Sequence, residues 1–463
     1  MRDVSARHYS TPTMKRRSFL TSSAAATFGF QVVSPHVLRA QAGGNTPNNK
    51  IRLAVIGCGG QGEGDLNNMA SEDIVALCDV DDRRAAGSFK RFPQAKRFKD
   101  FRKMFDDMAG GIDAVLVATP DHTHFVAAMA AMERGKHVYC EKPLAHSVGE
   151  VRAMQAKAVE KKVITQVGNQ GHSSHSIRAF VEMVQSGVIG KVTEVHAGCD
   201  AFKEVYACGH QRTKLKEKKD VPAELDWDLW LGPTAQRDYS PMYLPFNWRG
   251  YSAFGSGCIG DWVCHVLDPS FWALDLDLPT AITAETKGYD AAKDVEFYPK
   301  GTRITFEFPA KGDRGPVKII WHDGEFEIPT PDDLKKQGRK ANGIGAVVIG
   351  EKGKIMHGSH GAGSPHIITP ELLKDFKRPD EKIARVKDGN HHRDFLDAVR
   401  EGRPAGSSFA YGGALSEIGL LGMIAVQCSG RRLEWDAKAM KFTNDDEANK
   451  LITPSYREGW GKV

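Results

Sequence analysis

The 463-residue sequence has little of three things: cysteine, net charge and long apolar runs. Eight cysteines are too few for a disulfide scaffold in so long a chain, and there is no Cys-x-x-Cys pair to form part of a zinc cage. Beyond residue 42, no uncharged apolar run approaches the ~18–20 residues of a membrane span, and the longest candidate, residues 415–428, carries Glu417. We therefore expect no metal site and no transmembrane segment after the leader, and we expect His391 and His392 to pack or to face solvent.

The charge of the chain is concentrated at its N-terminus. The sequence holds 63 basic and 58 acidic residues, a formal net charge of +5. Residues 1–42 contain six of the basic residues and one of the acidic ones, which leaves 57 of each sign in the remainder. Because the remainder is balanced, we expect no nucleic-acid partner, and a neutral carbohydrate suits it better than an anionic surface.

Residues 1–42 show the parts of an export signal in the right order. The twin-arginine pattern KRRSFL occupies residues 15–20, a mild apolar stretch runs to residue 33, and Ala40-Gln41-Ala42 forms a small-x-small cleavage site. A disordered basic tail is the alternative, but it does not explain this order. We expect a twin-arginine signal peptide and a periplasmic or otherwise exported protein, with the true start at either Met1 or Met14.

From residue 50 the sequence alternates short apolar strands with amphipathic helices. The predicted strands are 51–56, 74–78, 114–118, 137–140 and 163–167, with a short one near Phe98, and the predicted helices include 125–134 and 148–161. This alternation is typical of a doubly wound parallel sheet. We predict an α/β protein whose first domain, residues 43–168, is an NAD(P)-binding Rossmann domain.

The pattern changes after Gly168. Strand-like segments at 192–196, 281–286, 302–308 and 317–321 recur without intervening helices. We predict that residues 169–463 form a substrate-binding and oligomerisation α+β domain with a large, mostly antiparallel open sheet. Residues 199–259 form a long irregular insertion rich in Trp, Tyr and Pro, and a loop of this length usually covers a site.

A glycine-rich motif follows the first predicted strand directly. GCGGQG at residues 57–62 matches G-x-G-x-x-G and opens a helix. Gly57 allows a sharp turn, Gly59 lets the backbone approach a pyrophosphate, and Gly62 permits close helix packing. The helix N-terminus adds amide donors for the anion. Gly57, Gly59, Gly60 and Gly62 are therefore the expected cofactor-binding glycines.

An acidic residue ends the second predicted strand about twenty residues later. Asp79 occupies the position that hydrogen-bonds the adenosine ribose hydroxyls in dinucleotide-binding domains. A carboxylate there repels a 2′-phosphate, so the sequence favours NAD over NADP. Arg83 and Arg84 leave NADP open, because an arginine just past this strand can hold that phosphate.

Three further motifs carry a family resemblance. ATPDHTH ends the predicted fourth strand at residues 118–124, EKP follows the fifth at 141–143, and Gly260-Asp261-x-x-x-His265 comes later. Together with the glycine loop, they resemble the glucose–fructose oxidoreductase, inositol dehydrogenase and rhizopine catabolism (Gfo/Idh/MocA) family over nearly all of the mature chain. The segments 225–233, 248–250 and 260–269 resemble its exported, twin-arginine branch.

The resemblance implies roles for three residues. Lys142 would lie beside the nicotinamide ribose and stabilise a developing alkoxide, and His265 would be the general base. Asp261, four residues earlier, would orient His265 or hold a second substrate hydroxyl. Taken singly, each is more simply explained as a surface lysine, a core histidine or a helix N-cap. Their co-occurrence with a cofactor motif favours catalysis.

Other residues are predicted to lie around this centre. Thr119, Pro120, His124 and Glu141 are expected on the cofactor side, with a structural turn as the alternative for Pro120 and His124. The candidate substrate contacts are Gln170, His172, Trp248 and Arg249. Core packing or oligomer contacts are the alternatives for the aromatic insertion.

The resemblance implies an NAD(P)-dependent oxidoreductase that transfers hydride between nicotinamide and a hydroxyl or carbonyl of a sugar, cyclitol or sugar derivative. Export implies a retained cofactor, because no soluble nicotinamide pool is expected outside the inner membrane. One alternative is an NAD-dependent glycoside hydrolase that works by transient C3 oxidation and elimination, although the Tyr-Pro-Thr-His-Gly stretch of those hydrolases is not evident. A non-catalytic carbohydrate-binding protein is the other. By analogy with the family, we expect a homodimer or homotetramer.

Overall fold

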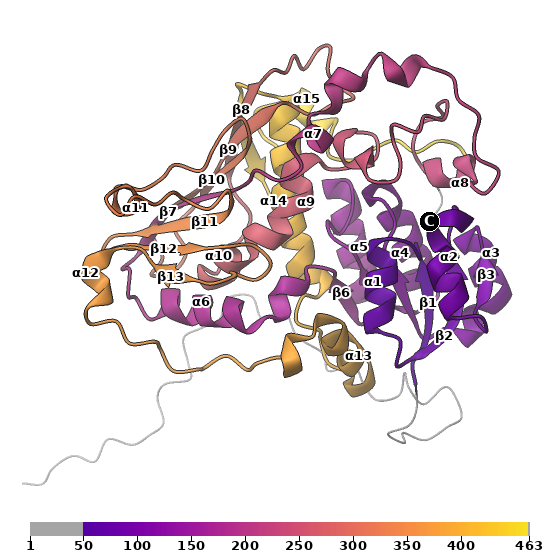
Figure 1. Cartoon of the computed structure of the whole chain (residues 1–463), viewed down its shortest axis with the longest axis horizontal. Helices are drawn as coiled ribbons and strands as arrows, with labels where there is room; N and C mark the ends of the chain where they lie inside the picture. The colour runs from indigo at the N-terminus through magenta and orange to yellow at the C-terminus, as the bar shows by residue number, and fades with distance from the viewer. Residues whose placement is uncertain (1–49, 462–463) are drawn as a thin grey trace, which may run out of the picture.

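The computed structural model describes residues 50–461, so the predicted signal peptide lies outside the described residues. Two sheets stand side by side with helices packed against them (Figure 1). The predicted fold class is confirmed: a parallel Rossmann sheet is followed by a separate, mostly antiparallel sheet.

The first sheet has six parallel strands in the order β3-β2-β1-β4-β5-β6. The strands are β1 (Arg52–Ile56), β2 (Asp73–Cys78), β3 (Lys96–Phe98), β4 (Ala114–Val117), β5 (His137–Cys140) and β6 (Thr165–Val167). The helices are α1 (Gln61–Asn68), α2 (Asp82–Arg91), α3 (Phe101–Met108), α4 (Asp121–Glu133) and α5 (Val148–Lys161). The strand order reverses between β1 and β4, and such a switch point forms a ligand crevice at the carboxyl ends of the strands.

The second sheet has nine strands in the order β13-β12-β11-β7-β10-β9-β8-β14-β15. Their bounds are β7 (Val192–Cys199), β8 (Ala281–Lys287), β9 (Gly301–Phe308), β10 (Val317–Gly324), β11 (Ile344–Gly350), β12 (Lys354–His357), β13 (His366–Ile367), β14 (Arg432–Asp436) and β15 (Lys441–Phe442). Strands β7 and β10 pair in parallel and the other pairs are antiparallel. In β9, Ile304, Phe306 and Phe308 face the core while the intervening residues are half-exposed, the alternation expected of a sheet with one covered face.

Helices cover the inner face of this sheet. The longer ones are α6 (His175–Gln185), α9 (Gly257–Val266), α10 (Asp268–Ala273) and α14 (Phe409–Gln427). Short helices are α7 (Lys203–Tyr206), α8 (Trp227–Leu231), α11 (Asp332–Lys335), α12 (Pro370–Leu373) and α15 (Asp446–Asn449). By length and composition α14 resembles a membrane span, but 83% of its apolar window is buried, as is usual for a core helix. Its Glu417 pairs with Arg152 of α5, which ties the two domains together.

The segment between β7 and α9 contains only short helices and is held by its own aromatic core. Trp227, Trp230, Tyr243, Tyr251 and Phe254 belong to one buried cluster. Trp227 and Trp230 stack with ring centroids 4.9 Å apart. The aromatic residues therefore mostly pack with one another, and only some of them reach the cleft described below.

The chain returns twice to the first domain, once before α14, β14 and β15 and once after them. Helix α13 (His391–Glu401) contributes Phe395 and Leu396 to the core cluster that contains β1 and β4. Near the end of the chain, the Tyr456 hydroxyl donates to Glu150 at 2.6 Å and Trp460 packs against Phe101. Figure 1 shows this end of the chain beside the first domain. Segments far beyond residue 168 thus pack against the first domain.

Candidate active site

A cleft of about 500 Å³ runs along the carboxyl ends of the first sheet and continues between the two domains. The expected site residues that line it are Gly57, Gly59, Gly60, Asp79, Thr119, Pro120, Glu141, Lys142, Gln170, Trp248, Arg249 and His265. Segments separated by some 200 residues of sequence therefore meet in one continuous space. One end is bordered by the glycine loop and the other by α9.

The glycine loop fits a dinucleotide because side chains are excluded from it. Gly57 has φ +85°, and a Cβ there would lie 2.6 Å from the Ala118 carbonyl oxygen. A Cβ at Gly62 would lie 1.9 Å from the Gly57 carbonyl oxygen, so α1 can approach the turn this closely only with glycine. No side chain caps the N-terminus of α1, so its first amides remain available to an anion such as a pyrophosphate.

Asp79 closes the adenosine end of the loop. Its carboxylate accepts hydrogen bonds from the Cys58 amide at 2.7 Å and the Asp81 amide at 3.0 Å. Burial raises the pKa of this carboxyl above its usual value. Of the two nearby arginines, Arg83 pairs with Asp81 at 2.8 Å, whereas Arg84 lines the cleft.

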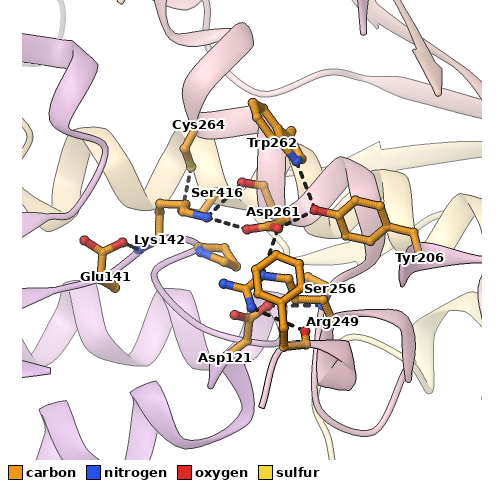
Figure 2. Close-up of polar contacts among 12 residues, drawn as sticks. Asp121, Glu141, Lys142, Tyr206, Arg249, Ser256, Asp261, Trp262, Cys264 and Ser416 are labelled. Carbon is orange, nitrogen blue, oxygen red and sulfur yellow. Dashed lines mark hydrogen bonds and ion pairs between the residues drawn. The ribbon is translucent and has the colours of Figure 1, made fainter. Parts of the chain in front are cut away.

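The opposite end of the cleft is centred on a buried ion pair. Lys142 follows β5, and its ammonium group pairs with Asp261 of α9. The other carboxylate oxygen of Asp261 accepts from the Tyr206 hydroxyl and from Arg249 Nε at 3.1 Å. Figure 2 shows Lys142, Tyr206 and Arg249 converging on Asp261. The carboxylate is thus shared by two cations and a phenol.

This arrangement fixes the charges of Lys142 and Asp261. Burial alone disfavours both charges, but the charges of Lys142 and Arg249 hold the pKa of Asp261 well below its usual value. Burial also opposes the ammonium of Lys142, yet the charges of Asp261 and Glu141 and the hydrogen bond to Asp261 together raise the pKa of Lys142. The site therefore presents a permanent ammonium group to the cleft.

His265 supplies a group of the opposite kind. Burial, followed by the charge of Lys142, holds the pKa of His265 well below its usual value, so the imidazole is neutral. Its Nδ1 is buried and has no hydrogen-bond partner within residues 50–461. No hydrogen bond joins it to Asp261 in that range either, so the predicted orienting contact between the two is not formed. His265 instead stacks on His360, a second histidine of the cleft.

Aromatic rings form the wall next to this centre. The guanidinium of Arg249 lies 4.2 Å from the ring centroids of both Phe246 and Trp248. Trp230 also lines the cleft. An aromatic wall beside the cations of Lys142 and Arg249 suits a ligand that has both apolar faces and hydroxyl groups.

Two predicted residues lie elsewhere. His172 does not line the cleft, contrary to the expectation, because its ring pairs with Asp268 at 3.0 Å and stacks on Trp272 in the second domain. His124 is also buried behind the cleft. Its ring nitrogens lie 2.9 Å from the Pro143 carbonyl oxygen and 2.8 Å from that of Thr119, so it braces the two loops that line the site.

Glu141 and Gln170 line the cleft and belong to a buried polar network. Gln170 donates to Glu141 at 2.7 Å, and His392 contacts Asp65 at 2.9 Å. Burial and the charge of Asp65 raise the pKa of Glu141 well above its usual value, and burial raises that of Asp65 to about 6. The two neighbouring carboxyl groups therefore bind protons more tightly than exposed carboxyl groups do.

Tyr206 and His360 were missed by the sequence reasoning. Tyr206 stands in the irregular insertion, where no motif marks it. His360 lies in the glycine-rich segment 358–364, and a loop of that composition beside two strands was the available signal. All eight cysteines are buried free thiols, and residues 50–461 contain no group of His, Cys, Asp and Glu able to hold a metal ion.

A dinucleotide cradle that opens onto a charged lysine and a neutral histidine defines a nucleotide-dependent oxidoreductase. Comparison with family models identifies the family of this oxidoreductase. Residues 51–169 match the model described as an oxidoreductase family with an NAD-binding Rossmann fold. Residues 173–312 and 336–462 match the model for the C-terminal alpha/beta domain of the same family. The chain belongs to the Gfo/Idh/MocA family of oxidoreductases, and its first domain binds NAD.

Characterised relatives and solved structures agree with this membership. Levoglucosan dehydrogenase of Pseudarthrobacter phenanthrenivorans is 25% identical over 361 residues, which is 75% of each chain. Inositol 2-dehydrogenase 2 of Saccharopolyspora erythraea is 32% identical over 152 residues, 32% of this chain and 44% of that protein. An inositol dehydrogenase homologue of Azotobacter vinelandii, solved with NADH and myo-inositol, superposes with a TM-score of 0.54 at 18% identity over 84% of this chain and 98% of that one.

Proposed function

We propose that this protein oxidises a hydroxyl-bearing carbon of a sugar or cyclitol, with Lys142 and His265 beside the reacting carbon and NAD retained through the cycle. One observation carries the proposal. A charged lysine and a neutral histidine line the same cleft as the glycine cradle, so a substrate hydroxyl can meet both where a nicotinamide would lie. The relatives that act on levoglucosan and inositol support this substrate class.

The residues divide the chemistry between them. Bound NAD supplies the acceptor for the hydride that leaves the carbon. His265 takes the hydroxyl proton, and Lys142 stabilises the negative charge that develops on the oxygen as it becomes a carbonyl. Asp261 keeps Lys142 charged, and Arg249 is placed to hold a neighbouring hydroxyl. The aromatic wall excludes water and orients the ring of the substrate.

The first experiment identifies the nucleotide released when purified protein is denatured, and then follows reduced-nicotinamide absorbance with levoglucosan and myo-inositol. Lys142→Met should retain the nucleotide but lose at least ~10²-fold in kcat. Release of the leaving group from an aryl glycoside with no net redox change would instead support the hydrolase alternative. Sugar binding without any turnover would support a non-catalytic protein. Either result overturns the proposal.

We propose further that the mature chain is exported through the twin-arginine pathway and cleaved after Ala42. The pattern at residues 15–20 and the charge-balanced remainder support this. Replacement of both Arg16 and Arg17 by lysine should leave the precursor in the cytoplasm, as measured by cell fractionation. N-terminal sequencing of the mature protein locates the cleavage site, and an uncleaved cytoplasmic wild type would contradict the proposal.

The outer face of the second sheet supports a homodimer or homotetramer. His196 of β7 and Arg303 of β9 are half-exposed there, and Ile320 of β10 adds an apolar centre. We propose that this face mediates association between copies of the chain. Ile320→Asp should lower the mass measured by light scattering to that of a monomer, and an unchanged mass would exclude this face.

A further inference from the structure

His360 contacts His265, the proposed base, although the two residues come from different elements of the second domain. It stands between β12 and β13, whereas His265 belongs to α9. The two imidazole rings are stacked, with centroids 4.1 Å apart and planes inclined by 19°. The His360 amide donates to the His265 carbonyl oxygen at 2.9 Å. The contact therefore involves both the ring and the main chain.

The loop that carries His360 is held in an unfavourable backbone conformation. His360 has φ +52°, and Ala362 and Ser364 have φ +57° and +53°, values that side chains rarely adopt. The hydroxyls of Ser174 and Ser176 donate to the Gly361 carbonyl oxygen at 3.1 and 2.7 Å. Contacts from the start of α6 thus hold the loop in a conformation that this sequence would not adopt alone.

The loop also fits tightly against the segment that follows β6. A Cβ at Gly171 would lie 2.2 Å from the carbonyl carbon of His360. Gly171 is the neighbour of Gln170, which lines the cleft. The absence of a side chain at Gly171 therefore allows the His360 loop to sit directly on the wall of the site.

Two charged residues act on this pair of histidines. They are Lys142 and Asp261, and the two histidines stack on each other. Trp262 stands edge-on to His360, with centroids 5.6 Å apart and planes at 90°. Burial, followed by the charge of Lys142, lowers the pKa of both imidazoles, so both rings are neutral at pH 7.

We propose that His360 is the positioning residue of His265: its ring fixes the plane of the base and closes that side of it to water. The alternative functions of a cleft histidine, direct substrate binding or metal binding, do not explain why the rings are parallel. The inference rests on the proposed role of His265 as the base. It adds that the base is held by a loop of the second sheet and not by the carboxylate of its own helix.

The test uses the purified, NAD-loaded protein and three variants at one position. His360→Ala removes the stacking ring, His360→Phe keeps a flat ring without a titratable group, and His360→Asn keeps polarity without stacking. Titration of the imidazole resonances by NMR, with His265→Asn to assign the base, reports its protonation without any substrate. The pH profile of kcat/KM with levoglucosan or myo-inositol gives a second readout.

In His360→Ala the resonance of His265 should titrate at higher pH than in wild type, because water reaches the ring. The value of kcat/KM should fall about 10²-fold, the cost of a misplaced catalytic group, mainly through kcat. His360→Asn should show the same changes in titration and kcat/KM as His360→Ala, whereas His360→Phe should retain most of the activity. His366→Ala, at β13 beyond the same loop, is the matched control and should change nothing.

Two results would overturn the inference: an unchanged titration of His265 in His360→Ala, or a His360→Phe protein as impaired as His360→Ala. Failure of the proposed function would look different. It would appear as activity that persists in His265→Asn, whatever the His360 variants do.

Discussion

The two ends of the cleft, the cofactor end and the chemical end, are formed by different parts of the chain. The cofactor end is made of main chain, because the glycine loop at residues 57–62 offers amides and close backbone approaches with few side chains. The chemical end is made of side chains from four separate segments, which supply Lys142, Tyr206, Asp261 and His360. The first end depends on local backbone geometry, and the second depends on how the whole chain packs. Substitutions should therefore disable the two ends in different ways.

The largest effect is expected at the cofactor end, from Gly62→Ala. The added Cβ would lie 1.9 Å from the Gly57 carbonyl oxygen, so the turn and α1 must separate. NAD affinity, measured by calorimetry and by the nucleotide content of the purified protein, should fall by ~10²-fold or more, which corresponds to about 2.7 kcal/mol.

Gly64→Ala is the matched control two residues later. Nothing lies within 4 Å of a Cβ at Gly64, and alanine is the better helix former by about 0.5–1 kcal/mol. This variant should bind NAD like the wild type and melt slightly higher. Normal NAD binding in Gly62→Ala would show that the cofactor end does not depend on backbone approach.

At the chemical end, Asp261→Asn should lower kcat about 10²-fold without loss of nucleotide. Lys142 would lose the carboxylate that raises its pKa. Without that carboxylate, the pKa of Lys142 falls. If activity needs the ammonium, the alkaline limb of the pH profile should therefore move to lower pH. Asp275→Asn, which removes an exposed partner of Lys311, is the control. An alkaline limb unmoved in Asp261→Asn would separate Lys142 from the reaction.

An ion pair outside the cleft supplies a reference for both ends. Glu182 of α6 accepts from the Arg385 guanidinium at 2.7 Å and from the Lys382 and Ile383 amides. The hydrogen bond from Arg385 contributes most to lowering its pKa, to about 2. Glu182→Gln should cost about 2 kcal/mol of unfolding free energy at pH 7 and leave the kinetics unchanged.

The pH dependence of the stability lost in Glu182→Gln shows whether the charge of Glu182 or its shape provides the stabilisation. An unfolded glutamate titrates near pH ~4.3, so the stabilisation is complete above that value and is lost as the pH falls toward 2. The difference in stability between Glu182→Gln and wild type should narrow over this range in urea titrations. Glu381→Gln, which removes the exposed partner of Arg385, should have little effect at any pH.

The smallest effect is expected from Arg84→Ala at the cofactor end. The Arg84 guanidinium lies over Gly60, where a Cβ would be 2.7 Å from it, and contributes a charge rather than a backbone contact. NAD affinity should weaken only about 2–5-fold, the value of one exposed ion pair. Arg83→Ala, whose guanidinium is turned to Asp81, should weaken it less. A loss as large as that of Gly62→Ala would refute the contrast drawn between the two ends.

The same contrast explains how far the sequence could predict the molecule. The strands of the first sheet, the glycine loop and Asp79 were predictable because each is a local pattern read within about 25 residues. Strand β9 was predictable from its alternation, since each inward residue is apolar. Lys142, Asp261 and His265 were identified through motifs, and the structure brings all three to one end of the cleft.

Side-chain directions were the part that could not be predicted. The end of β6 locates the main chain near the cleft, but a single turn of 3-10 helix over Gln170–Ser173 points Gln170 into the cleft and His172 away toward Asp268. His360 and Tyr206 reach the site across long stretches of chain, and no local pattern encodes such contacts. The predicted contact between Asp261 and His265 is absent from the described residues for the same reason. The Asp261 carboxylate instead accepts from Lys142, Tyr206 and Arg249.

The two late returns of the chain to the first domain set the order in which the protein can be finished. The core around β1 lacks Phe395 and Leu396 until α13 has been made, and Trp460 reaches Phe101 only after the last strands of the second sheet have been made. Most of the second domain is therefore synthesised before the core around β1 is complete. A chain without α13 lacks part of the core that packs under β1 and β4, the strands whose carboxyl ends border the cleft.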